Sequence, residues 1–526
     1  MRDFQLPGRS PVFAERGMCA TSHPIAAAAA VDILRQGGNA ADAAIAGAVL
    51  LGICEPQMTG IGGDCFALIS PGGSDEVHAL NGSGRSASAW DAEALRARGL
   101  KAVPTDTPDA VTIPGAVAGF AALSERFGRL GLAASLAPAI DYAETGVPVA
   151  PRVAFDWAAS ADRLIGDARA HYLIGGAVPR AGQVFRAPAQ AGVLRRIAEH
   201  GPSAFYTGEV ADDMLSILRA HGGCHDEADF AAQTADWGET VSTRYGDMEV
   251  VEHPPNGQGA TALLLLNILR EFDLASLDPF GAERAHIEAE AARLAYDARN
   301  RLIADPAWMD RRDRMLDPTL ARDLAALIDT GRALDNVTAR TEAVHRDTIY
   351  ITVVDRDRLA VSLIYSIFHS FGSGLASPRF GILLQNRGAG FTLAPGHPNE
   401  AGPRKRPMHT IIPGMVRRNG QAVMPFGVMG GQYQANGHAR FVTNMVDFGL
   451  DPQAAIDGPR SFAEDGSLLV ERGYGDGVAA ALSELGHRVV TPPVGIGGAQ
   501  AILIDPHTGV LQGGSDPRKD GAAIGY

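Results

Sequence analysis

The chain has 526 residues, 46% of them hydrophobic and 20% charged, which is typical of a globular protein large enough to bury a substantial core. Its formal net charge of −14 argues against nucleic acid or an anionic membrane surface as a partner. No stretch reaches the roughly 18 to 20 uninterrupted apolar residues of a membrane span, and the first residues contain no apolar signal region. We therefore expect a cytoplasmic protein.

The first two-thirds of the chain carries mainly helical patterns. Two alanine-rich apolar segments at 24–36 and 40–51 are separated by the tripeptide GGN, which is typical of a helix end followed by a new start. The glycine-rich loop TGIGGD at 59–64 then leads into an apolar strand at 65–70. Further helices are predicted at 115–127, 186–200, 208–221, 258–272 and 282–304.

From residue 348 the pattern changes to strands. Segments 348–355 and 359–368 are rich in β-branched residues and are joined by the turn sequence DRDR. No internal repeat and no low-complexity linker divides the chain, so we expect one interleaved domain of two stacked sheets covered by helices. The other predicted strands lie at 381–385, 410–416, 421–428, 468–472, 498–504 and 509–513, and helices are predicted near 434–448 and 476–486.

The cysteines and the glycine-rich loops offer no signature of a metal or cofactor. The four cysteines form no CxxC pair, and a chain of this size needs no disulfides, so we expect free thiols. The loops GIGGD and GSGR lack the GxGxxG spacing between a strand and a helix, and no GxxxxGK[ST] loop occurs. The fifteen histidines are scattered. The sequence therefore predicts neither a metal site nor a cofactor.

Thr348 opens the strand-rich part, within HRDTIYITVVD at 345–355. Threonine is a common strand former, so this position alone gives no sign of catalysis. Its surroundings, however, resemble the gamma-glutamyltranspeptidase family over nearly the whole chain. The matching segments follow the family's order: ATSHPIAAAAAVDILRQGGNAADAAIA at 20–46, CEPQMTGIGGDCFAL at 54–68, TIPGAVAGF at 112–120, TIYITVVDRDRLAVS at 348–362, FGSGLASPRFGILLQNRGAGF at 371–391, GPRKRPMHTIIP at 402–413 and SDPRKDGAAIGY at 515–526.

The resemblance implies an α+β fold of the N-terminal-nucleophile hydrolase type, a four-layer αββα sandwich. It also implies an inactive precursor that breaks its own bond between Asp347 and Thr348. The products would be a large subunit, 1–347, and a small subunit, 348–526, which stay interlocked as one domain. Whether two such units pair into a dimer is left open.

Residue chemistry favours a threonine in this role once it stands at a chain terminus. A hydroxyl is a poor nucleophile at neutral pH and needs a base. Cleavage would create an α-amino group on Thr348, and such a group has an unperturbed pKa of about 7.7–8.0, near the pH at which a general base works best. One residue would then supply both nucleophile and base, and the uncut precursor would be inactive.

The resemblance assigns three further residues around the nucleophile. The segment VMGGQYQ at 428–434 matches the family segment whose paired glycines offer backbone N–H groups to the oxyanion, so Gly430 and Gly431 are expected to do the same. By itself a glycine pair also marks a turn between a strand and a helix, and the two interpretations are compatible. Ser366 stands where the family has a hydroxyl that hydrogen-bonds the nucleophile.

The substrate pocket departs from the family pattern. Gly390 stands where the family has an acidic residue that holds an α-amino group, and Phe368 replaces an asparagine that helps it. The serine pair that holds the α-carboxylate is replaced by His409 and Thr410, and the arginine paired with that carboxylate aligns with Trp90. A buried ammonium left without its carboxylate is strongly disfavoured, so an amino-acid head group would lose its anchor. The loop at 391–403 is also short, which indicates that the lid seen in some family members is missing and predicts an open pocket.

The altered charges favour an anionic amide that lacks an amino group. Arg387 and His409 would attract a carboxylate beside Thr410, and Arg85 in the NGSGR segment is a further cation expected near the pocket. This pattern resembles the branch of the family that includes oxamate amidohydrolase and some cephalosporin-type acylases. The preferred expectation is hydrolysis of oxamate through a threonyl acyl-enzyme, with release of ammonia.

Several alternatives stay open at this point. The enzyme could act as an acylase on a larger anionic side chain, or as a gamma-glutamyltransferase and glutathione hydrolase like the main family. From another class, it could be a non-catalytic relative that keeps the fold for binding, although the presence of Thr348, Ser366 and the glycine pair favours an enzyme. Arg387 could also be a surface arginine at the pocket rim.

Overall fold

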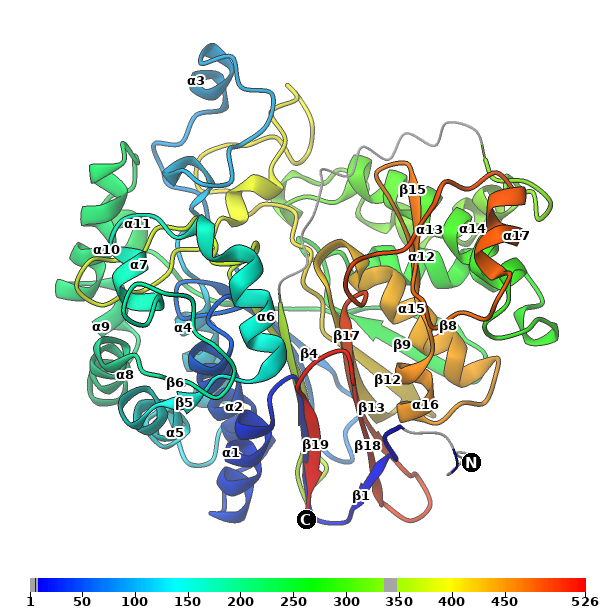
Figure 1. The fold of residues 1–526 in the computed structure, drawn as a ribbon, viewed down its shortest axis with the longest axis horizontal. Helices are drawn as coiled ribbons and strands as arrows, with labels where there is room; N and C mark the ends of the chain where they lie inside the picture. Colours follow the sequence, from blue (N-terminus) through cyan, green and yellow to red (C-terminus); the bar gives the residue numbers. More distant parts are fainter. Residues whose placement is uncertain (1–4, 6–7, 335–347) are drawn as a thin grey trace.

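Two seven-stranded antiparallel sheets face each other at the centre of the computed structural model, which describes residue 5 and residues 8–334 and 348–526. Helices cover the outer side of each sheet (Figure 1), so the layers run helix, sheet, sheet, helix. The strand orders are β1-β18-β17-β13-β12-β9-β8 and β19-β2-β10-β11-β3-β4-β7. The protein is therefore an α+β, four-layer αββα sandwich, as the resemblance implied.

Each sheet contains strands from both sides of Thr348. The first sheet contains β1 (Val12–Ala14), β8 (Val241–Tyr245), β9 (Met248–Glu252), β12 (Gly414–Arg418), β13 (Gln421–Met429), β17 (Gly498–Ile504) and β18 (Leu511–Ser515). The second contains β2 (Met18–Thr21), β3 (Asp64–Ser70), β4 (His78–Gly82), β7 (Asp236–Gly238), β10 (Ile349–Val354), β11 (Ala360–Ser366) and β19 (Ala522–Gly525).

One helical layer comes from a single stretch of chain and the other from two. The layer over β10 and β11 includes α1 (Pro24–Arg35), α2 (Ala40–Cys54), α4 (Ala116–Phe127), α5 (Leu132–Thr145), α6 (Pro151–Ser160), α8 (Pro188–His200) and α10 (Glu209–Ala220). The opposite layer includes α12 (Gly259–Leu269), α13 (Ala282–Leu302), α14 (Pro318–Ala325), α15 (Gln434–Val446), α16 (Pro452–Asp457) and α17 (Val478–Glu484). Shorter elements are α3 (Ala92–Ala97), α7 (Asp167–Tyr172), α9 (Ser203–Tyr206), α11 (Glu227–Ala231), β5 (Val147–Pro148), β6 (Val184–Phe185), β14 (Ser461–Glu464), β15 (Ser467–Val470) and β16 (Val489–Val490).

Strand β10 is buried on both faces, which explains why all but one of its residues, Thr352, are hydrophobic. Successive side chains point to opposite faces of a strand. Ile349, Ile351 and Val353 join the core under α1 and α2, whereas Tyr350 joins the core between the sheets with Met429 of β13. The start of β10 is thereby fixed between two packed layers.

Most of the predicted elements are present. The helices expected at 24–36, 40–51, 115–127, 186–200, 208–221, 258–272 and 282–304 correspond to α1, α2, α4, α8, α10, α12 and α13, and those near 434–448 and 476–486 to α15 and α17. The strands β3, β10, β11, β13, β15, β17 and β18 are also where the sequence places them, to within a few residues. All four cysteines are free thiols, and among the described residues no helix is long and apolar enough to cross a membrane.

Three features differ from the prediction. Segment 381–385 is not a strand, because its backbone bonds to the loop at 373–377 and forms only an isolated bridge between Ala376 and Leu383. The strand expected at 410–416 begins only at Gly414. The helical interpretation of the first 347 residues was also incomplete, because that part supplies seven of the fourteen strands of the two large sheets.

Candidate active site

Thr348 directly precedes β10, at the edge where the two sheets meet the loops that follow β11 and β13. The residue is fully buried. Its Oγ lies 3.5 Å from the Ser366 Oγ and 3.5 Å from the Gln434 Nε2. Gln434 is itself held in place, because its Oε1 accepts a hydrogen bond from the Ile412 backbone N–H at 2.9 Å. Asp347, the other residue of the expected cleavage bond, lies outside the described residues.

Ser366 ends β11, and the antiparallel register of β10 with β11 sets it across from Thr348. Its Oγ accepts hydrogen bonds from the Phe368 backbone N–H at 2.9 Å and from Arg387 Nη2 at 3.3 Å. The same oxygen also accepts the hydroxyl proton of Thr348, at an Oγ–Oγ distance of 3.5 Å. Three donors therefore converge on the Ser366 oxygen.

Arg387 is fully buried, in contrast to the surface position that the sequence left open. Its Nη1 donates to the Thr410 Oγ1 at 3.1 Å, and its guanidinium carbon lies 4.0 Å from the centre of the Phe368 ring. Among the described residues no carboxylate lies within ion-pair distance of it, and its Nε–H has no hydrogen-bond partner. Burial lowers the pKa of Arg387 to about 9, although the nearby Asp64 carboxylate opposes the change.

Asp64 is a site residue that the sequence analysis missed. Its Oδ1 accepts hydrogen bonds from the backbone N–H groups of Gly84 and Gly115 and from the Gln385 side chain, at 2.9, 3.0 and 2.8 Å. Its Oδ2 lies 3.2 Å from the His409 Nε2. Burial raises the pKa of Asp64 to about 6, and the charge of Arg387 opposes the rise. The signal in the sequence was an acidic residue ending a glycine-rich loop, immediately before a strand.

His409 and Thr410 occupy a short segment before β12. The His409 backbone N–H donates to the Asn256 carbonyl at 2.7 Å, and the Thr410 carbonyl accepts from the Gln258 Nε2 at 2.7 Å. The His409 ring is directed to Asp64, whereas the Thr410 hydroxyl is directed to Arg387. These contacts gather Arg387, His409 and Thr410 into one buried polar group next to Thr348.

Gly430 and Gly431 link the end of β13 to the start of α15. Their φ angles are +128° and +57°, in the region that favours glycine. A Cβ on Gly430 would lie 2.8 Å from the Gly497 Cα, so the backbone has no space for a side chain there. The same connection places Gln434 against Thr348. Gln434 follows Gly431 by three residues, so the glycine pair is close in sequence to a residue that contacts the candidate nucleophile.

If Gly430 is the oxyanion donor that the resemblance implies, we expect Gly430→Ala to lower kcat by about 100- to 1,000-fold, because moving such a donor has an effect of that size. The displaced backbone would no longer present its N–H groups to the developing charge. Steady-state kinetics on the processed enzyme measure the loss. The matched control is Gly449→Ala, which also has a positive φ, of +62°, but meets no atom within 4 Å. Similar losses of activity in both variants would show that the effect is general backbone strain.

Arg85 does not join this group. Its side chain is 41% exposed, and its Nη1 and Nη2 lie 3.4 Å from Asp305 and 3.5 Å from Asp236. With Arg406 it lines a separate cavity of about 790 Å³. Arg85 is thus paired with Asp236 and Asp305, and we do not include it among the proposed substrate ligands.

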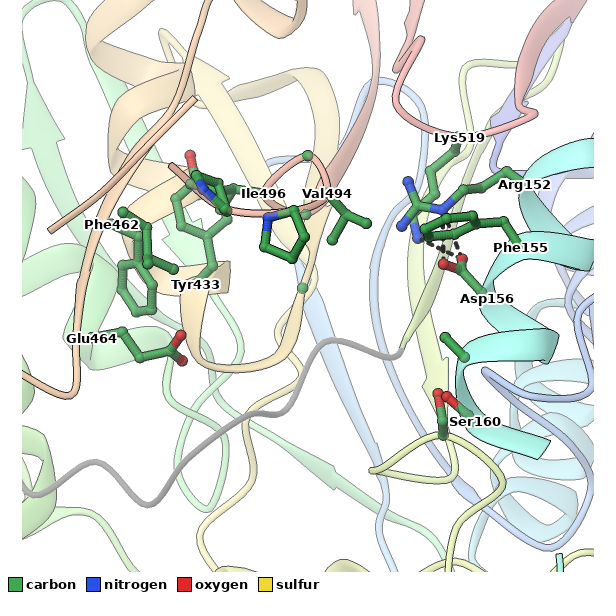
Figure 2. A pocket seen from close by; sticks show the side chains of 18 residues that line it. Arg152, Phe155, Asp156, Ser160, Tyr433, Phe462, Glu464, Val494, Ile496 and Lys519 are labelled. Atoms are coloured by element: carbon green, nitrogen blue, oxygen red, sulfur yellow. Dashed lines mark hydrogen bonds and ion pairs between the residues drawn. The ribbon is translucent and has the colours of Figure 1, made fainter. Parts of the chain in front are cut away.

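Two other cavities flank the segment from Gly430 to Gln432. One, of about 310 Å³, has polar and apolar lining in similar measure and is lined by Phe368, His369, Gly390 and Gln432 among others. The second, of about 400 Å³, is lined by Gly430 and by two walls that face each other in Figure 2. Both cavities therefore border the candidate oxyanion segment.

His286, Glu290 and His487 are the residues whose ligand atoms come close enough together for a metal ion, among those that the structure describes. His286 and Glu290 lie one turn apart on α13. Each already has protein partners: His286 contacts the Asp329 carbonyl and His487, while Glu290 accepts from Arg293 and from the Leu334 backbone N–H. The group is thus accounted for as a hydrogen-bonded cluster.

Comparison with known proteins identifies the family. The family model described as gamma-glutamyltranspeptidase matches residues 26–526. The chain belongs to the gamma-glutamyltranspeptidase family. Proteins of this family are amide hydrolases or transpeptidases that act on carbon–nitrogen bonds, and this chain is an enzyme of that type.

Similar members of the family carry different names. A glutathione hydrolase-like YwrD proenzyme of Bacillus subtilis is 37% identical, with 98% of this chain and 99% of the relative covered. An oxamate amidohydrolase proenzyme of Klebsiella pneumoniae is 34% identical, covering 97% and 98%. The crystal structure of a cephalosporin acylase from Bacillus halodurans superimposes with a TM-score of 0.92 at 39% identity, covering 100% of this chain and 99% of that one. The relatives therefore establish the reaction class but not the substrate.

Proposed function

We propose that this member of the gamma-glutamyltranspeptidase family cuts its own chain between Asp347 and Thr348 and then hydrolyses a small anionic amide through Thr348. Oxamate is the specific substrate that we propose. The observation that carries the substrate class is Arg387. Its guanidinium is fully buried, has no ion-paired carboxylate among the described residues, and bonds the same Ser366 hydroxyl that faces Thr348.

The proposed cut is compatible with a stable product. The future small subunit supplies β10 and β11, which lie between β2 and β3 of the future large subunit, and β19 pairs with the outer side of β2. Separating 1–347 from 348–526 would break these ladders and expose both faces of β10. The two pieces are therefore expected to stay together after cleavage.

The reaction that we propose needs only groups of this chain and water. The free α-amino group of Thr348 takes the proton of its own hydroxyl while the oxygen attacks the amide carbon. Backbone N–H groups of Gly430 and Gly431 stabilise the oxyanion. The proton passes to the amide nitrogen, the carbon–nitrogen bond breaks, and the amine leaves. Water then attacks the threonyl ester with the same amine as base, which releases the acid and restores Thr348.

The position of Arg387 favours a carboxylate very close to the carbonyl carbon. The arginine is separated from the Thr348 oxygen by one hydroxyl, that of Ser366. In oxamate the carboxylate is bonded directly to the carbon under attack. A longer acyl chain would carry its carboxylate several bonds farther from Thr348. An arginine fork with unused donors is well suited to bind such a carboxylate through charge-assisted hydrogen bonds.

An α-amino group would find no comparable partner in this site. Gly390 offers no side chain, and both oxygens of Asp64 are already engaged by four donors. The positive charge of Arg387 would repel an ammonium in the same place. We therefore expect gamma-glutamyl compounds to be poor substrates.

Three amides test the proposed specificity on the processed enzyme. Oxamate and oxamide have nearly the same shape, but oxamide is uncharged, and a gamma-glutamyl anilide carries the amino-acid head group. We expect kcat/KM for oxamate to exceed kcat/KM for oxamide by about 10- to 100-fold, because a hydrogen bond to a charged group contributes binding free energy of that size. Preferential turnover of the gamma-glutamyl anilide would overturn the substrate proposal while leaving the nucleophile intact.

A further inference from the structure

The 400 Å³ cavity beside Gly430 is larger than hydrolysis of oxamate requires. The leaving group of oxamate is ammonia, which is about the size of one water molecule. A water occupies roughly 30 Å³ of liquid, so the cavity has space for on the order of ten non-hydrogen atoms. A cavity of this size next to the reaction centre calls for an occupant larger than ammonia.

One wall of this cavity is apolar. Tyr433 and Phe462 lie on it, and they also pack edge to face, with ring centres 5.5 Å apart. Val494 and Ile496 continue the wall toward the opposite side (Figure 2). Across from them, Phe155 of α6 is 54% exposed and belongs to the cavity lining. Apolar side chains therefore face the cavity from both sides.

The charged groups of the cavity balance one another. Arg152 donates to the Asp156 carboxylate at 2.8 Å, and the Lys519 Nζ lies 3.7 Å from the same carboxylate. Figure 2 shows these three side chains together on the α6 side, with Glu464 on the facing wall. Two cations and two carboxylates leave no net charge. The cavity should therefore select its occupant by apolar area rather than by charge.

The two cavities match the two halves of an amide. Phe368, whose ring packs against Arg387, lines the 310 Å³ cavity together with Gly390, whereas Gly430 lines the more apolar 400 Å³ cavity. The acyl and amine portions of an amide extend from opposite sides of its carbonyl carbon. An acyl group held near Phe368 and Arg387 leaves the cavity at Gly430 for the amine portion.

We propose that the cavity between α6 and Phe462 binds the amine portion of the substrate, and that this portion is an aromatic or branched apolar group. The inference rests on the proposed function and sharpens it: the preferred substrates are N-substituted oxamates rather than oxamate itself. Burial of a ring against Phe155, Val494 and Phe462 supplies binding that ammonia cannot use.

Val494→Trp tests this inference, because the larger side chain fills the cavity without touching the polar group around Arg387. We expect kcat/KM for N-phenyl oxamate to fall about 10- to 100-fold, as expected for losing an apolar subsite, while kcat/KM for oxamate changes less than about threefold. The matched control is Val184→Trp, at a 41% exposed valine outside the cavity, which should leave both values unchanged. Equal losses for both substrates in Val494→Trp would overturn the inference.

A binding measurement separates this inference from the proposed function. Fluorine NMR of 4-fluoroaniline reports contact with the processed protein whether or not any amide is turned over. We expect broadening with wild type and with Val184→Trp, and its loss with Val494→Trp. If neither oxamate nor N-phenyl oxamate is hydrolysed but 4-fluoroaniline shows this pattern of broadening, the proposed function fails and the cavity assignment stands. If 4-fluoroaniline binds wild type and Val494→Trp equally, or neither, the cavity assignment is wrong.

Discussion

Replacing Thr348 with alanine is expected to leave one uncut chain of 526 residues with no detectable amide hydrolysis. The substitution removes the hydroxyl proposed to attack first the preceding peptide bond and later the substrate. Loss of a nucleophile of this kind lowers kcat by about 10⁴- to 10⁶-fold in comparable hydrolases. Intact mass and steady-state turnover of the purified variant measure the two effects.

A matched control for this substitution lies in the same strand. Thr352 is also fully buried on β10, and its Oγ1 donates to the Val361 carbonyl at 3.1 Å. Thr352→Ala removes an equivalent hydroxyl and methyl group without touching the site, so it should still be processed and active. Thr348→Ser, which keeps a hydroxyl, should also be cut. Processing of Thr348→Ala would exclude this residue as the nucleophile.

Replacing Arg387 with glutamine is expected to lower kcat/KM for oxamate by about 100-fold or more, because a charge-assisted, bidentate partner of the carboxylate is lost. The value for uncharged oxamide should change by less than about tenfold, since oxamide makes no charged contact. The preference for oxamate over oxamide should therefore nearly disappear. Arg387→Lys, which keeps the charge but not the fork, should fall between wild type and glutamine.

The buried position of Arg387 requires a control for folding. Completed self-processing and an unchanged melting temperature would show that the variants retain the native site. Arg85→Gln provides the comparison, because Arg85 was the other cation expected near the substrate but contacts Asp236 and Asp305 instead. It should leave kcat/KM for oxamate within about threefold of wild type, as surface substitutions usually do. A larger effect at Arg85 than at Arg387 would show that the carboxylate binds elsewhere.

The fold was predictable where local pattern and burial agree. Strands such as β10 and β17 lie in the interior of a sheet, so their sequences are mostly apolar and easily recognised. The pair β8 and β9 lies at the edge of its sheet, mixes exposed and buried positions, and was missed between two helices. Segment 381–385 had the composition of a strand, but its partner is a nearby loop rather than a sheet.

The site was predictable as a set of residues, but its geometry depended on the fold. Resemblance selected Thr348, Ser366 and Arg387, and the structure brings their side chains into contact. Asp64 was missed because its partners, from Gly84 to His409, come from distant parts of the chain. Arg85 was close in sequence to a family position, but its side chain contacts Asp236 and Asp305. These partners are distant in sequence, so no local pattern around Arg85 could predict the contacts.

The intact mass of freshly purified wild-type protein, with N-terminal sequencing of any smaller piece, shows whether the chain cuts itself before Thr348. We expect two co-purifying pieces of about two-thirds and one-third of the chain, the smaller beginning at Thr348. A folded protein that stays whole after long incubation, or that is cut at another bond, would contradict self-activation at Thr348. A non-catalytic binding role for this fold would then become the leading explanation.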